Sequence, residues 1–449
     1  MLAVRGRRQV GKSRLYTEFV EGGQLPHVFF TAVKSGPLVV QMDAFQRDAR
    51  ESAVNVPGGD VLFDDAPQGW SDVFTRLRLV AAAGPLVVVL DEFPWACETS
   101  PTLEGELQNA WDRYLQHLPI LLVLVGSDVT MMERLTAHDR PLYGRAREDV
   151  IRPFNPAEVG EAIGTSNPMA AFDAYLTTGG YPKLVEDVGR AGGVRSYIAQ
   201  GIRDENTDLV VVAQRSLDAE FPTDAQARRV LSAIGGHDVG HSTFSTVVGM
   251  VGDDPSTSGV ALTRSLRVLG EQKRVLTIEH PAGTKATTRQ RRYRVADPYL
   301  RFWFRFIEPH LANIARGRGD VALAAFDAGW SSWRGLAIEP VVRDAVARLA
   351  PSIPTLASVT DVLPWWNRDN SVEVDIVASA GSVVEALGSI KWRERRKVTT
   401  AELYNLAAAR SIVPHAGAAR LAIVCPAGAE AAVNADLVLT AADLLTAWD

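Results

Sequence analysis

The sequence predicts an α/β fold whose N-terminal third is built on a parallel sheet. Two observations predict it: short runs rich in Val, Leu, Ile and Phe alternate with amphipathic helical stretches, and a glycine-containing turn follows the first run. Strands that alternate with helices are typical of a parallel sheet covered by helices. The expected strands are residues 2–5, 27–32, 85–90, 120–126 and 148–152, with helices at 69–83 and 103–118.

The turn after the first expected strand carries the strongest motif. Residues 6–13 read GRRQVGKS, which matches the pattern G-x-x-x-x-G-K-[ST], and a helical stretch follows. Such a loop folds its backbone N–H groups around a phosphate, beside the positive end of the helix dipole. Lys12 can reach the β- and γ-phosphates, and Ser13 can hold Mg²⁺. The predicted contacts with the nucleotide are Gly6, Arg7, Arg8, Gln9, Val10, Gly11, Lys12, Ser13 and Arg14.

An acidic pair follows the third expected strand. Asp91 and Glu92 come directly after the apolar run 87–90, so both are expected at the carboxyl end of that strand. Asp91 is predicted to hold Mg²⁺ with Ser13, and Glu92 to orient or deprotonate the attacking water. An apolar run that ends in Asp-Glu is common by itself. Downstream of a phosphate loop, it indicates hydrolysis rather than storage of the nucleotide.

Two further polar residues near this sheet have alternative interpretations. Ser127 follows the strand at 120–126 and is either a sensor of the γ-phosphate or part of an ordinary helix cap. Arg145 is either a finger that stabilises charge in the transition state or a solvated surface arginine. The sequence leaves both choices open. The predicted catalytic residues are Lys12, Glu92 and Arg145.

The middle of the chain changes to helical patterns. Residues 156–221 are expected to form a helical lid, and Gly179 and Gly180 in the turn 177–182 are interpreted as a flexible hinge or sensor. Residues 222–305 then follow the order of a winged helix, which is a helix-turn-helix variant. Its expected helices are 225–234, 242–251 and 259–271, and its expected strands are 275–280 and 290–295.

Basic residues concentrate in the expected winged helix. From position 264 to position 294 the only acidic residues are Glu271 and Glu279, although the whole chain has a net charge of −6. A basic patch suits the phosphates of double-stranded DNA, with the third helix in the major groove and the wing at 281–290 on the backbone. The alternative is that this module packs as a lid or contacts proteins. The candidate DNA contacts are Arg264, Lys285, Arg291 and Arg292.

Taken together, these motifs resemble the archaeal-type ATPase family, a branch of the AAA+/STAND-like P-loop NTPases. The resemblance covers nearly the whole chain. It implies ATP and Mg²⁺ as cofactors, ATP hydrolysis, a winged helix, and a C-terminal domain similar to restriction endonucleases. The implied domains are 1–155, 156–221, 222–305 and 306–449. The matching stretches are GRRQVGKSRL, VVVLDEFPW, LVGSDVTMM, PLYGR, RPF, TGGYP and YRVADPYLRFWFRF.

The sequence departs from the family at its first residues. Family members carry a segment before the first strand that helps to form the adenine pocket, whereas this sequence begins inside that strand. We expect the true start to lie further upstream. This departure affects recognition of the base and leaves the prediction of phosphate binding unchanged.

The final segment suggests a degenerate nuclease site. Nucleases of the PD-(D/E)XK type hold Mg²⁺ with several carboxylates and a lysine, and the candidate residues are Glu339, Asp375 and Lys391. Active members carry Asp or Glu two residues before the lysine, but this chain has Ser389, which is a poor ligand for Mg²⁺. We expect this domain to bind nucleic acid or a partner rather than to cleave DNA. Trp365, Trp366 and Trp392 are expected in packing rather than in base stacking.

Composition excludes several classes of protein. Hydrophobic residues make up 47% and charged residues 22% of 449 residues, which is typical of a globular chain. The 2 cysteines exclude a disulfide framework and a cysteine zinc site. The sequence shows no signal region and no apolar run of the ~20 residues that cross a membrane, so a cytoplasmic protein is expected.

Three functions follow from these observations. The first is an Mg²⁺-dependent ATPase coupled to a DNA-binding winged helix. The second is a STAND-like signalling or defence switch that acts through protein partners, with a homo-oligomer as one form. The third is an ATP-gated DNA nuclease.

Overall fold

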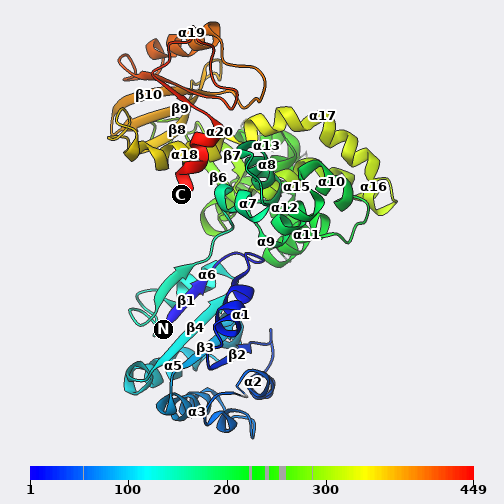
Figure 1. Ribbon diagram of the computed structural model, residues 1–449, viewed down its shortest axis with the longest axis vertical. Coiled ribbons are helices and arrows are strands. Elements are labelled where there is room, and N and C mark those ends of the chain that lie inside the picture. The colour runs from blue at the N-terminus through cyan, green and yellow to red at the C-terminus, as the bar shows by residue number, and fades with distance from the viewer. Residues whose placement is uncertain (54, 222–224, 238–241, 252–258, 286) are drawn as a thin grey trace. The chain divides into compact units, whose positions relative to one another are not determined.

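The computed structural model describes residues 1–449 except 54, 222–224, 238–241, 252–258 and 286 (Figure 1). The chain divides into two compact units, Met1–Pro153 and Phe154–Asp449. The expected end of the first domain at residue 155 lies next to this division. The finer division of the second unit at residues 221 and 305 stays a prediction.

The first unit is built on a five-stranded parallel sheet in the order β2-β3-β4-β1-β5. The predicted parallel α/β fold is therefore confirmed. Because β4 lies between β1 and β3, the carboxyl ends of these three strands meet at one edge of the sheet. The strands are β1 (Leu2–Arg5), β2 (His27–Thr31), β3 (Leu86–Asp91), β4 (Ile120–Gly126) and β5 (Arg147–Val150).

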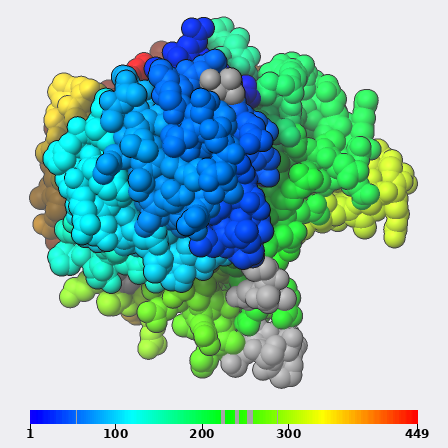
Figure 2. Space-filling model, turned by 90° about the horizontal axis from the view of Figure 1, so that it is seen from below, coloured from blue at the N-terminus to red at the C-terminus, as the bar shows by residue number. Residues whose placement is uncertain are grey.

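Helices cover both faces of this sheet, with one core cluster on each face. The atoms of the first unit are closely packed in the space-filling view (Figure 2, blue to cyan). The larger core cluster includes Phe30, Phe45 and Trp70, and the smaller one includes Val4 and Val89. The helices are α1 (Lys12–Gly22), α2 (Leu38–Ser52), α3 (Trp70–Ala83), α4 (Phe93–Thr99), α5 (Leu103–Arg113) and α6 (Val129–Leu135).

Helix α2 was not predicted from the sequence. Its first turn exposes Leu38, Val39 and Val40, so apolar residues lie outside as well as inside and obscure the helical period. The helix expected at 103–118 ends earlier, at Arg113, and a short 3-10 turn follows. Such turns lie at Gly59–Leu62, Leu115–His117, Glu308–His310, Ala350–Ser352, Ala409–Ser411 and Thr446–Trp448.

The second unit begins with a group of helices. A capping box between Asn155 and Glu158 starts the first of them, because the Asn155 side chain accepts from the Glu158 N–H and the Glu158 carboxylate accepts from the Asn155 N–H. These helices are α7 (Pro156–Ala162), α8 (Pro168–Thr178), α9 (Pro182–Ala191), α10 (Val194–Gly201) and α11 (Asp208–Glu220).

The turn between α8 and α9 is a packed anchor, which corrects its interpretation as a flexible hinge. Thr177 and Thr178 are fully buried. Gly180 has φ +74, and a Cβ atom there would lie 2.0 Å from the carbonyl oxygen of Phe154. The Tyr181 hydroxyl donates to Asp297 Oδ2 at 2.6 Å. Glycine is therefore needed here for close approach to the chain at the start of the second unit rather than for flexibility.

Three helices and an antiparallel hairpin follow, in the order expected for a winged helix. We call residues 225–295 the helix–hairpin segment. Several residues of this stretch, including 222–224 at its expected start and 286 in the expected wing, lie outside the described residues. The elements are α12 (Ala225–Gly236), α13 (Phe244–Val251), α14 (Gly259–Arg267) with a π-helical turn at Val268–Gln272, β6 (Leu276–Glu279) and β7 (Arg292–Val295).

The C-terminal part holds a mixed sheet in the order β12-β11-β10-β9-β8, in which β8, β9 and β10 are antiparallel and β10, β11 and β12 are parallel. Its strands are β8 (Asp361–Trp366), β9 (Glu373–Ala380), β10 (Val383–Ile390), β11 (Arg420–Val424) and β12 (Leu437–Leu439). Its helices are α15 (Pro298–Phe306), α16 (Leu311–Ala315), α17 (Gly319–Ala337), α18 (Glu339–Leu349), α19 (Thr400–Ala408) and α20 (Ala441–Leu445).

Two details of this part bear on the sequence predictions. Helix α17 ends at Ala337 and α18 begins at Glu339, with Pro340 in its first turn, where the missing N–H of proline costs no helical hydrogen bond. Trp365, Trp366 and Trp392 are all buried, which confirms their predicted packing role. Within the described ranges, no helix is both long and apolar enough to cross a membrane.

Candidate functional site

The loop after β1 has a backbone conformation that requires glycine. Gly11 has φ +86, and Gln9 also lies in the left-handed region at φ +66. A Cβ atom on Gly6 would lie 2.4 Å from the carbonyl oxygen of Ile151. Val10 is buried and ties the loop to the core, whereas Arg8 and Arg14 are exposed. Glycine at positions 6 and 11 and the buried Val10 therefore fix the conformation of the loop.

Lys12 lies at the centre of this loop. Its Nζ donates to the carbonyl oxygens of Gly6 at 2.7 Å and Arg7 at 2.9 Å, and the residue is only 6% exposed. Burial lowers the pKa of Lys12 to about 8, against the opposing attraction of Glu92 and Asp91. A polyphosphate in the loop would offer the ammonium group better acceptors than these two carbonyls.

Asp91 at the end of β3 is joined to the start of α1. The Ser13 hydroxyl donates to Asp91 Oδ2 at 2.6 Å, and the Glu92 N–H donates to Asp91 Oδ1 at 2.9 Å. The structure therefore brings the two predicted Mg²⁺ ligands into direct contact. A hydroxyl and a carboxylate are the hard oxygen donors that Mg²⁺ prefers, so this donor set fits the ion.

Glu92 is held by a residue from the neighbouring strand. Ser127, directly after β4, donates from its hydroxyl to Glu92 Oε2 at 2.9 Å. Glu92 itself has φ +50, a strained position for a residue with a side chain. The cap of α6 is Asp128, whose side chain accepts from the Met131 N–H at 2.9 Å. Ser127 thus contacts the predicted base, a pairing for which the sequence carries no signal.

Arg145 has partners within the first unit. Its Nε and Nη2 donate to the two carboxylate oxygens of Asp112, both at 2.8 Å, and Nη1 donates to the carbonyl oxygens of Pro141 and Tyr143. A role as an arginine finger stays a prediction, and it requires this bidentate ion pair to open.

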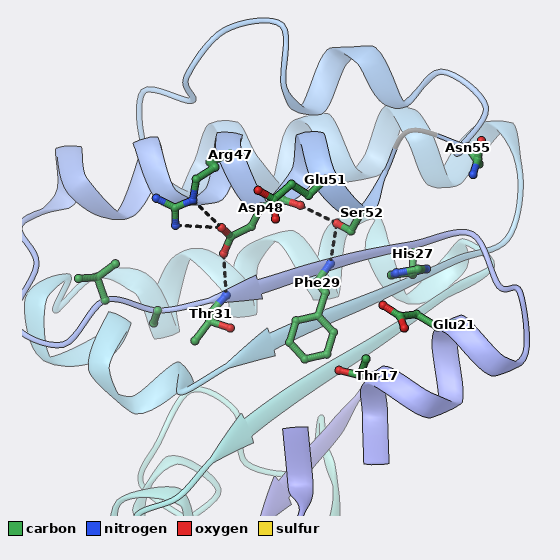
Figure 3. Close-up of a pocket in the computed structure, with 12 residues that line it drawn as sticks. Thr17, Glu21, His27, Phe29, Thr31, Arg47, Asp48, Glu51, Ser52 and Asn55 are labelled. Atoms are coloured by element: carbon green, nitrogen blue, oxygen red, sulfur yellow. Dashed lines mark hydrogen bonds and ion pairs between the residues drawn. The ribbon is translucent and has the colours of Figure 1, made fainter. Parts of the chain in front are cut away.

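A separate pocket of 720 Å³ lies along the free edge of β2 (Figure 3). Thr17 and Glu21 of α1 form one wall, and α2 forms the other. Two of the β2 N–H groups at this edge donate to side chains of α2. The Phe29 N–H donates to Ser52 Oγ and the Thr31 N–H to Asp48 Oδ2, both at 3.1 Å. Helix α2 thereby protects the edge strand from pairing with another chain. None of the predicted phosphate-loop contacts lines this pocket.

The predicted DNA contacts fall into different environments. Arg264 on α14 and Lys285 in the hairpin loop are exposed. Arg291 is half-buried, and its Nε donates to the Thr288 carbonyl oxygen at 2.9 Å. Arg292 is 3% exposed, so its prediction as a DNA contact is corrected.

Arg292 has partners in the C-terminal part that explain its burial. Its Nη1 pairs with Glu373 Oε1 at 2.5 Å, and its guanidinium lies 4.1 Å from the centre of the Trp366 ring. The Ala282 N–H also donates to the Pro364 carbonyl oxygen at 2.9 Å. Part of the hairpin therefore packs on the C-terminal sheet.

The three predicted nuclease residues lie in one region of the C-terminal part. Asp375 Oδ2 accepts from the Ile390 N–H at 2.7 Å and from the Ser389 hydroxyl at 3.2 Å. Asp375, Ser389 and Lys391 line a pocket of 450 Å³. Burial and the nearby Asp375 carboxylate raise the pKa of Glu339. Among the residues that the structure describes, no three His, Cys, Asp or Glu side chains are grouped to hold a metal ion.

The parallel sheet, the phosphate loop and the acidic pair define the first unit as a P-loop NTPase fold. In the second unit, residues 303–403 match the family DUF234, described as "Archaea bacterial proteins of unknown function". This match and the fold of the first unit agree with the expected resemblance to archaeal-type P-loop ATPases. The likeness of the C-terminal part to restriction endonucleases stays a prediction.

Individual relatives are distant. The chain is 23% identical over 406 residues to Uncharacterized protein MJECL04 of Methanocaldococcus jannaschii, which covers 90% of this chain and 85% of that protein. Among solved structures, the Walker-type ATPase PABY2304 of Pyrococcus abyssi is 19% identical with a TM-score of 0.46, over 67% of this chain and 89% of that one. The ORC2 protein of Aeropyrum pernix is 12% identical with a TM-score of 0.37, over 72% and 88%.

Proposed function

We propose that the first unit binds Mg²⁺–ATP and hydrolyses it. The observation that carries this proposal is a continuous set of hydrogen bonds beside the phosphate loop. It runs from the Ser13 hydroxyl to Asp91, from Asp91 to the backbone of Glu92, and from the Glu92 carboxylate to Ser127. Residues from α1, β3 and the end of β4 thus meet beside the loop that would hold the phosphates in this proposal.

Each residue has a separate task in this proposal. The loop N–H groups hold the phosphates, and Lys12 exchanges its contacts with the Gly6 and Arg7 carbonyls for phosphate oxygens. Ser13 and Asp91 would hold Mg²⁺, which would supply positive charge against the charge that develops on the phosphate. Glu92 accepts the proton of the attacking water. Ser127 fixes the position of the Glu92 carboxylate through its hydroxyl.

Turnover of Mg²⁺–ATP by the full chain tests this proposal. Lys12→Ala is expected to abolish nucleotide binding, and Glu92→Gln to retain binding while it removes turnover. Glu98→Gln is the matched control, because Glu98 is exposed on the adjacent helix α4 and carries the same charge. A Glu92→Gln variant that turns over at the wild-type rate would show that the base is assigned wrongly.

We further propose that the helix–hairpin segment binds the phosphates of double-stranded DNA. The exposed residues Arg264, Lys285 and Arg289 support this, because a solvated basic face is what phosphate contact requires. The double variant Arg264→Ala, Lys285→Ala should reduce the slope of log binding constant against log salt concentration by about 1 for each phosphate contact that is removed. An unchanged salt dependence would assign these residues to another role.

A partner-driven switch is the second candidate function. The contact between Ala282 and Pro364 favours it, because a wing that packs on its own C-terminal part presents less surface to a duplex. ATP turnover measured with and without duplex DNA separates the two. Stimulation by DNA supports the coupled ATPase, and indifference to DNA supports the switch. Assembly into a homo-oligomer and a cytoplasmic location stay predictions.

A further inference from the structure

The largely buried acidic residues Glu339 and Glu279 share a basic partner, Arg343. Arg343 lies on α18, one helical turn after Glu339, and is 6% exposed. Its Nη1 is 3.5 Å from Glu339 Oε2 and 3.2 Å from the Asp375 carbonyl oxygen. Its Nη2 is 3.1 Å from Glu279 Oε1, which belongs to β6 of the helix–hairpin segment. One guanidinium therefore contacts the carboxylate of Glu339 and the backbone of Asp375, the two acidic residues that a nuclease of this type would use for metal binding.

We propose that Arg343 is the resident cation of this site and that the residues present do not fit a divalent metal. Buried carboxylates need a compensating positive charge, and here it is covalently attached to the same helix as Glu339. A metal ion would have to displace a tethered guanidinium from between its acceptors.

The other side chains at the site agree with this assignment. Ser389 stands where a nuclease carries its second carboxylate, and its hydroxyl donates to Asp375 Oδ2. The Ile390 N–H donates to the same oxygen. Asp375 therefore has one carboxylate oxygen that already accepts two hydrogen bonds, which leaves a weak ligand set for Mg²⁺.

The Arg343 guanidinium also connects this site to the hairpin. Glu279 Oε1 accepts from Arg343 and, at 2.7 Å, pairs with Arg294 of β7. Glu279 is only 13% exposed, so this is a buried network that crosses from the hairpin to α18. The site thus joins the helix–hairpin segment to the C-terminal part. This inference is independent of the proposed ATPase activity.

Thermal unfolding of the full chain with and without Mn²⁺ tests the proposal in the absence of nucleotide. Mn²⁺ is expected to leave the transition of the second unit unchanged in the wild type. Arg343→Ala should lower the midpoint by roughly 5 °C or more, because it removes the partner of the largely buried Glu339 carboxyl group and one of the two partners of Glu279. Mn²⁺ should then restore part of that loss, because the vacated position can accept a metal cation. Arg343→Lys should retain stability without any response to Mn²⁺.

Arg348→Ala is the matched control, because Arg348 lies on the same helix in an exposed pair with Asp344. It is expected to change neither the midpoint nor the response to Mn²⁺. A direct titration of the wild type with Mn²⁺ needs no variant at position 343 to fold. Binding of Mn²⁺ to the wild type that disappears in Asp375→Asn would overturn the proposal, as would Arg343→Ala with wild-type stability.

Discussion

Two acidic sites in this molecule use the same residue types in opposite ways. In the first unit, Asp91 and Glu92 stand beside Lys12, whose ammonium group donates to the loop carbonyls of Gly6 and Arg7. In the second unit, Glu339 and Asp375 stand beside Arg343, which is fixed by three acceptors from three elements. The first site can exchange its internal contacts for a ligand. In the second site we propose that Arg343 occupies the position of a metal ion, so its acidic residues join the helix–hairpin segment to the C-terminal part.

The largest expected difference between the two sites is in catalysis. Glu92→Gln should lower ATP turnover by ~100- to 10,000-fold, the usual contribution of a general base. Asp375→Asn should leave turnover within about twofold, because it removes no group from the phosphate-loop site. Steady-state ATP hydrolysis by both purified variants measures this. Equal losses in the two variants would mean that the sites are coupled.

The second site should contribute more to the free energy of unfolding than the first. Arg343→Met is expected to cost ~3–5 kcal/mol of unfolding free energy, because it breaks a buried ion network from one side. Lys12→Met should change it by under about 1 kcal/mol, since burial already disfavours the charged form of Lys12. Urea unfolding measures both. A larger cost for Lys12→Met would make its ammonium group a structural element of the loop.

A smaller effect is expected at Ser127. Ser127→Ala should lower kcat about tenfold with little change in KM, because the hydrogen bond positions Glu92 rather than the nucleotide. Ser127→Thr retains the hydroxyl and should recover most of the rate. If Ser127→Ala instead raises KM alone, Ser127 contacts the nucleotide, as a γ-phosphate sensor would.

The smallest effect concerns pH. Because the pKa of Lys12 is lowered to about 8, its positive charge is present below that pH and is lost above it. ATP affinity should therefore fall by about fivefold between pH 8 and pH 9, because the charged fraction of Lys12 falls from about one half to about one tenth. Lys12→Ala should show no measurable binding at any of these pH values. Nucleotide titrations at several pH values measure it, and a flat wild-type profile would contradict the role of Lys12.

The sequence by itself determined the parts of the molecule that depend on local pattern. The loop at 6–13, the strands of the first sheet and the pair Asp91-Glu92 were predictable, because each is encoded by neighbouring residues. The contact between Ser13 and Asp91 also followed, since the carboxyl ends of parallel strands meet the loop at one edge.

Only the tertiary structure decided which side chains are available for function. Ser127 meets Glu92, Arg292 pairs with Glu373, and Arg343 reaches Glu279 through contacts between residues far apart in the chain. Gly180 packs against Phe154 rather than forming a hinge. The sequence shows which charged and flexible residues the chain contains. The burial of a side chain and its partners decide whether that side chain can contact a ligand. Both arise only when segments that are distant in the sequence pack together.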